Sequence, residues 1–121
     1  AKAPKGADYL IDGVSKGYND AKGYAWGTLP CSFIVEFKKT QRIGEVRFLL
    51  WDADRRRTYR YRLFVQHQSG DDWDLIADHK DKPSKSWQAH SFKKRAVRAV
   101  KIEGLGNSVN DQFHLVEIEA R

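Results

Sequence analysis

The chain has 121 residues, 40% of them hydrophobic and 12% aromatic, with a formal net charge of +6 at pH 7. This length suits one domain that buries roughly two-thirds of its unfolded surface without metals or cross-links, and the aromatic content excludes a disordered chain. We therefore expect residues 1–121 to form a single domain. The sequence has no long apolar stretch, so it predicts no membrane insertion, and its single cysteine, Cys31, excludes an internal disulfide.

The positive charge favours anionic partners, which include nucleic acid, acidic polysaccharide and acidic protein surfaces. Basic residues occur along most of the chain, for example at Lys38-Lys39 and at Lys93-Lys94-Arg95. Such runs are usually solvated, so this pattern favours an evenly solvated basic surface over a dedicated basic groove. Nucleic acid is the weaker expectation, because strand periodicity explains the alternation of Tyr and Arg from Tyr59 to Arg62 better than base stacking does.

In chain order, the first thirty or so residues carry glycines and scattered aromatic rings without a period, and they predict a loop-rich cap. From Ser32 onward, short runs of β-branched and aromatic residues are broken by turn residues at intervals of about eight to twelve positions. This spacing is typical of an all-β, antiparallel β-sandwich. The expected strands are 32–37, 44–51, 59–67, 72–78, 86–92, 97–104 and 113–120.

The most polar bend of the sequence follows an apolar strand. Trp51 ends that strand, and Asp52, Asp54 and the arginines 55–57 follow it. Charged groups of this kind cannot lie within a buried strand, so we expect them at the rim of the sheet, where rigid β scaffolds carry their binding residues.

Further along, the period of two from Tyr59 to Leu63 predicts that Tyr59, Tyr61 and Leu63 face the core. The segment 69–72 predicts a hairpin turn in which Gly70 is free to adopt a positive φ.

A set of sequence markers occurs in a fixed order along almost the whole chain. The markers are Leu10–Gly13, Leu49–Asp54, Tyr59, Tyr61, Ser69–Trp73, Ser86–Gln88, Phe92, Val97–Arg98, Gly106–Asn107, Asn110, Phe113–His114 and Glu117. With them the chain resembles the discoidin, or coagulation-factor type C, domain superfamily, and it is similar to family 32 carbohydrate-binding modules and to the discoidin-type domains of BTB-domain proteins. The resemblance implies a galactose-binding-like jelly roll whose loops at one end bind the ligand.

The same resemblance implies a non-catalytic module that binds carbohydrate and targets a larger protein. Sugar recognition needs an apolar ring against the sugar and polar groups for its hydroxyls, and the arginines together with the net charge favour an acidic glycan. The alternative is a protein-interaction domain that recognises an acidic protein or peptide surface through arginines 55–57. The ligand-binding residues expected for the carbohydrate-binding module are Tyr24, Trp26, Asp54, Arg56, Arg57, Asn107, Asn110 and His114.

Several of these residues also have a structural explanation. Tyr24 and Trp26 are equally suited to closing the end of the sandwich. Asp54 is explained by an ion pair with a neighbouring arginine, and His114 by a place in the core or at its rim.

By resemblance alone, one structural calcium ion is expected, held by Asp12 and Glu117 with help from Ser15, although Asp12 before a glycine also forms turns. The sequence predicts no enzyme, because the four histidines lie on separate segments and no nucleophile elbow is present. The compartment stays open: secreted for a bacterial carbohydrate-active protein, cytoplasmic for a BTB-type protein.

Overall fold

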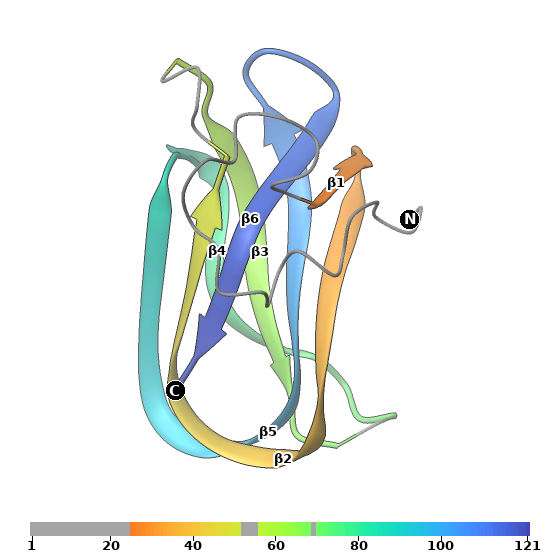
Figure 1. Ribbon diagram of the computed structural model, residues 1–121, viewed down its shortest axis with the longest axis vertical. Coiled ribbons are helices and arrows are strands. Elements are labelled where there is room, and N and C mark those ends of the chain that lie inside the picture. Colours follow the sequence, from red (N-terminus) through yellow and green to blue (C-terminus); the bar gives the residue numbers. More distant parts are fainter. Residues whose placement is uncertain (1–24, 52–55, 69) are drawn as a thin grey trace.

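Figure 1 shows the computed structural model, in which residues 25–51, 56–68 and 70–121 are described. The predictions for Asp12, Ser15, Tyr24 and Asp54 therefore lie outside the described residues. Within the described part the chain is built of strands joined by turns, which confirms the all-β prediction. The strands are β1 (Ala25–Thr28), β2 (Cys31–Leu50), β3 (Tyr59–Gln66), β4 (Asp74–Ser84), β5 (Trp87–Asn107) and β6 (Gln112–Ala120).

All of these strands belong to one antiparallel sheet in the order β1-β6-β2-β5-β3-β4, and this sheet folds over on itself. Residues 31–36 of β2 pair with 99–104 of β5, which also pairs with β3, and β3 pairs with β4. Residues 45–49 of β2 pair with 87–91 of β5 and with β6, and β6 pairs with β1. Strands β2 and β5 therefore contribute to both layers of the sandwich, and their bends are visible in Figure 1.

The bends correct two of the predicted strand boundaries. The segments 32–37 and 44–51 form one strand, and so do 86–92 and 97–104. Register shifts between β2 and β5 at Glu36/Gln41 and Ile43/Glu45 bend both strands without ending them, because an irregularity of this kind adds unpaired residues that turn the strand. Strand β1 was not expected, since its four residues carry no alternation long enough to detect.

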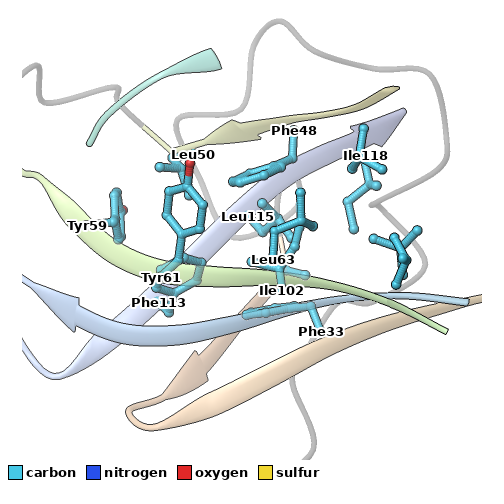
Figure 2. Packing of buried hydrophobic residues seen from close by; sticks show 14 of the residues in the cluster. Phe33, Phe48, Leu50, Tyr59, Tyr61, Leu63, Ile102, Phe113, Leu115 and Ile118 are labelled. Atoms are coloured by element: carbon cyan, nitrogen blue, oxygen red, sulfur yellow. The ribbon is translucent and has the colours of Figure 1, made fainter. Parts of the chain in front are cut away.

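The core lies between the two layers, and Figure 2 shows its aromatic centre. Phe48 on β2 meets the edge of Tyr61 on β3, with ring centroids 4.9 Å apart. Phe33 and Phe113 pack from opposite layers at 5.8 Å. Tyr59, Tyr61 and Leu63 are fully buried, as the period of two predicted.

Two ends of the sandwich follow from this topology. The β1–β2 and β5–β6 turns lie at one end, together with the start of β3 and the end of β4, and we call it the loop end (Figure 1). The bends of β2 and β5 lie at the other end, the bend end, with the β3–β4 turn. In that turn Gly70 has a φ of 87°, which confirms the expected hairpin. No helix suited to crossing a membrane occurs in the described ranges.

Candidate functional site

Two connections at the loop end are fixed to each other by hydrogen bonds. The backbone N–H of Thr58, just before β3, donates to the Ser108 hydroxyl at 2.8 Å. The backbone N–H of Ser108, in the β5–β6 loop, donates in return to the Thr58 carbonyl at 2.9 Å. The chain that follows the arginine bend and the loop that carries the two asparagines are therefore neighbours, although about fifty positions separate them.

Arg57 has a defined position at this end because it lies over an aromatic ring. Its guanidinium carbon is 4.6 Å from the centre of the Trp51 ring, and Trp51 in turn packs on His114 at 5.6 Å between ring centroids. A cation over an indole face gains about 0.5–2 kcal/mol, depending on how far both groups are desolvated. Trp51 therefore supports Arg57, although the sequence analysis did not identify it as a site residue. Its position between an apolar run and the arginines was the feature of the sequence that could have indicated this role.

His114 lies beneath this pair and is buried, with only 5% of its surface exposed. Its Nδ1 is 3.0 Å from the Tyr59 hydroxyl and its Nε2 is 3.2 Å from the Gln112 side-chain oxygen. Both ring nitrogens are therefore engaged within the protein. His114 therefore lies at the rim of the core, and its contact with a ligand stays a prediction.

Asn107 and Asn110 shape the β5–β6 loop. The Asn107 amide donates to the Asn110 side-chain oxygen at 3.0 Å and to the Gln112 carbonyl at 2.8 Å. The Asn107 oxygen accepts from the Val109 backbone at 2.8 Å. The polar atoms of the Asn107 side chain therefore form hydrogen bonds within the loop. The side-chain amide nitrogen of the exposed Asn110 has no hydrogen-bond partner among the described residues.

The remaining described candidates are arranged around this centre. Trp26 on β1 is half-buried and stands opposite His114 in the β1–β6 register. Arg56 is exposed beside Arg57. The structure therefore brings Arg57, His114 and the asparagine loop together, with Trp26 on the adjoining edge strand.

Glu117 on β6 is the only described member of the implied calcium set, and it is buried, with 3% exposed. A buried carboxylate is stable only with compensating partners. The described ranges contain no group of three or more His, Cys, Asp or Glu residues able to hold a metal ion. The described residues therefore supply one buried carboxylate toward such a site.

A second polar cluster, which the sequence did not predict, closes the side of the sandwich between β4 and β5. His79 and His90, on separate segments, meet with ring centroids 5.0 Å apart. The Tyr61 hydroxyl donates to the Gln88 oxygen at 2.9 Å and lies 2.6 Å from His90 Nε2. His79 Nδ1 is 2.9 Å from the Ser84 hydroxyl. No spacing rule could have paired these histidines, because they lie in different layers: His79 pairs with Tyr61 of β3, and His90 pairs with Val46 of β2. They meet only where the two layers of the sandwich close on each other.

Burial governs the electrostatics of this cluster. The pKa of His90 is lowered by burial first, and then by His79 and Lys82. The pKa of His79 is lowered by burial and by Lys82, against an opposing effect of Asp78. Burial also raises the pKa of the Tyr61 hydroxyl. The neutral forms of both imidazoles are therefore favoured in the folded protein.

This pair predicts a pH-dependent stability. Histidines of the unfolded chain take up protons near pH 6.5, whereas His79 and His90 of the folded chain do so only at lower pH. Between these two pH values the unfolded state binds more protons than the folded state. The stability therefore falls as the pH drops below about 6.5. We expect the melting temperature to fall by roughly 3–6 °C between about pH 7.5 and pH 5.

Thermal melts of His90→Gln should show a smaller fall over the same range, since one of the two groups is gone. His67→Gln, which changes an exposed histidine in the β3–β4 turn, is the matched control and should keep the fall of the unchanged protein. Equal falls in both variants would contradict the assignment.

Solved carbohydrate-binding modules share this fold. The family 32 module (CBM32) of AlyQ, in complex with 4,5-unsaturated mannuronic acid, superposes with a TM-score of 0.74 at 14% identity, over 95% of this chain and 84% of that one. A pectin-binding carbohydrate-binding module gives 0.77 at 17% identity, over 98% and 87%. Chitosan-binding module 2 from a Paenibacillus chitosanase/glucanase, in complex with chitotriose, gives 0.73 at 19% identity, over 99% and 94%. These likenesses establish the fold: the chain is a galactose-binding-like β-sandwich, as the resemblance implied.

Relatives in sequence come from a different group of proteins. BTB/POZ domain-containing protein 9 of Drosophila melanogaster is 37% identical over 119 residues, which cover 93% of this chain and 16% of that protein. The Homo sapiens protein of the same name is 32% identical over 122 residues, covering 91% of this chain and 20% of that protein. No family model matches the chain. The chain thus spans a fifth or less of these relatives, and it is similar to one segment of BTB/POZ domain-containing protein 9.

Proposed function

We propose that the loop end binds a carbohydrate and that the chain acts as a non-catalytic module that targets a larger protein. The observation that carries this proposal is Arg57, held over Trp51 at 4.6 Å and placed beside the β5–β6 loop with its two asparagines. Support comes from the fold, because the solved modules described above are named for the saccharides that they bind.

An acidic glycan is the preferred ligand within this proposal. A guanidinium presents two parallel N–H donors that match a carboxylate, and stacking on an indole orients them before the ligand arrives. Arg56, which is exposed, adds a second cation next to the half-buried Arg57. Two of the fold neighbours are named for mannuronic acid and pectin, which is in keeping with a uronic acid carboxylate as the group that Arg57 contacts.

Calorimetric titration tests the proposal. An oligosaccharide of uronic acids should bind weakly, with a Kd on the order of 0.1–1 mM, and a neutral oligosaccharide of equal length should bind at least about tenfold more weakly. Absence of binding by every saccharide tested would contradict carbohydrate recognition. Equal binding of the acidic and neutral chains would contradict only the preference for acid.

The non-catalytic assignment has support in the second cluster. Ser84 and His79 are in contact, which is the arrangement that activates a serine nucleophile when the hydroxyl donates to the imidazole. The Ser84 hydroxyl has two acceptors within reach, His79 Nδ1 at 2.9 Å and the Lys82 carbonyl at 3.0 Å. Ser84 is buried, with 8% of its surface exposed, so a substrate has little access to its hydroxyl, and the contact is explained as packing within β4.

A second candidate function is recognition of an acidic protein surface through the same arginines. The observation that favours it is that the relatives with 32–37% identity are named for a BTB/POZ domain, whereas the three solved modules described above are only 14–19% identical. An acidic peptide whose affinity falls in Arg57→Ala, in a protein that binds none of the saccharides tested, would support this function in place of the first.

The calcium ion stays a proposal, with Glu117 as its described ligand. A carboxylate oxygen is a ligand that calcium favours, and an ion that binds only the folded chain stabilises it. We expect millimolar calcium to raise the melting temperature and a chelator to remove the increase, with Glu117→Gln insensitive to both. An unchanged melting temperature in the parent protein would contradict the site.

A further inference from the structure

The bend end carries a concentration of positive charge that the linear sequence does not reveal. Residues 37–44 of β2 and 91–97 of β5 form the two bends, and they are neighbours because Arg42 pairs with Ala96 and Ile43 with Arg95. Both dilysine runs lie within them and are exposed. We call this surface the basic bend; it consists of Lys38, Lys39, Arg42, Lys93 and Lys94.

The nearby carboxylates on the strands do not neutralise the basic bend, because arginines already bind them. Among the described residues, none of the five cations of the basic bend forms an ion pair. The exposed Asp71 and Asp72 of the β3–β4 turn share this end of the molecule, so the positive surface is limited to the two bends. The existing pairs are Arg95 with Asp74 at 2.6 Å, Arg98 with Glu36 at 3.6 Å and Arg121 with Glu45 at 2.8 Å.

We propose that the basic bend is a docking surface for an acidic polypeptide segment, separate from the loop end and additional to the function proposed there. Exposed charges that lack partners create a field that attracts an oppositely charged partner and speeds its association. Five cations on two adjacent bends suit a flexible run of Asp and Glu residues, whose carboxylates follow one another along an extended chain.

The surroundings of the five cations favour an acidic polypeptide over single-stranded nucleic acid. Four of the five cations are lysines, which act as point charges and attract carboxylates and phosphates alike, so the discrimination comes from the aromatic rings nearby. Single-stranded nucleic acid also needs exposed rings for base stacking. The rings of the bends, Phe37 and Phe92, pack against the hydrophobic core instead.

Fluorescence anisotropy with a labelled peptide of about ten glutamates tests the proposal. At about 50 mM salt we expect a Kd on the order of 10–100 µM, weakening about tenfold at about 200 mM because exposed charges are screened. The double variants Lys38→Glu/Lys39→Glu and Lys93→Glu/Lys94→Glu should each weaken binding at least about tenfold.

Lys80→Glu/Lys82→Glu is the matched control, because it makes the same change in net charge at exposed lysines of β4. It should alter the Kd by no more than about twofold. An equal loss in this control would show an effect of net charge and overturn the proposal. No peptide binding at low salt would also overturn it.

Two further measurements separate the possible partners and surfaces. Arg57→Ala should leave peptide binding intact. If Arg57→Ala loses peptide affinity and the bend variants keep it, the peptide binds at the loop end and the inference is overturned. The outcome of the saccharide titrations does not depend on this result. If a short DNA duplex binds through the basic bend and the peptide does not bind, the partner of this surface is nucleic acid and the proposal of an acidic polypeptide is overturned.

Discussion

Gly104→Ala should destabilise the protein by about 2–3 kcal/mol, measured as a lower midpoint in denaturant unfolding. Gly104 lies on β5 inside the sandwich, where a Cβ would be placed 2.6 Å from Cγ and 2.9 Å from Cβ of Phe113. Phe113 cannot move aside freely, because its ring packs on Phe33 and on the edge of Tyr59. The added methyl group therefore forces the two layers apart at the centre of the core.

Gly106→Ala is the control, since it lies two residues further along the same strand. The three atoms nearest to a Cβ there all belong to the guanidinium of Arg60, the far end of a flexible and exposed side chain, and the loss should stay below about 1 kcal/mol. Phe113→Leu combined with Gly104→Ala should be more stable than the sum of the two single changes predicts. Equal losses of stability in Gly104→Ala and Gly106→Ala would mean that the contact between residue 104 and Phe113 does not limit the packing. Strictly additive effects of Gly104→Ala and Phe113→Leu would mean the same.

Arg57→Ala should weaken saccharide binding about tenfold or more, and Trp51→Ala should weaken it by a similar factor although Trp51 is assigned no contact with the ligand. The reason is geometric: the indole face holds the guanidinium at 4.6 Å, and without it the flexible arginine must be ordered during binding. Calorimetry on both single variants and on the double variant measures the coupling.

If Trp51 acts through Arg57, the double variant should bind no more weakly than either single variant. Arg57→Lys separates charge from geometry, because lysine keeps the charge and loses the planar fork; it should recover only part of the affinity. Arg42→Ala, at the opposite end of the molecule, is the control and should bind as the unchanged protein does. Additive losses at Trp51 and Arg57 would show that Trp51 contacts the saccharide directly.

Much of the fold could be predicted because strand alternation is a local property. The period of two from Tyr59 to Leu63 needed no tertiary information, and neither did the glycine turn before β4. The continuity of β2 and β5 was missed for an equally physical reason. Polar residues such as Lys38 and Lys39 resemble a loop, yet the strand continues past them because a register shift absorbs the extra residues.

The candidate site was predictable in outline only. The sequence placed the arginines beyond the end of a buried strand, and the structure puts Arg57 at the loop end, next to the asparagine loop. The sequence could not show that Asn107 forms its hydrogen bonds within that loop or that His114 packs against Trp51, since each depends on which residue lies next to it in the fold. The contact between His79 and His90 could not be predicted for the same reason.

The all-β class, the inward face of β3 and the excess of positive charge follow from the amino-acid sequence alone, because each depends on the order or the number of side chains. The location of that charge depends on the fold. The tertiary structure brings two dilysine runs more than fifty positions apart onto neighbouring bends and ties the arginine connection to the asparagine loop at the opposite end. Both outcomes depend on long-range strand pairing, whose register is fixed by the whole core rather than by any local pattern.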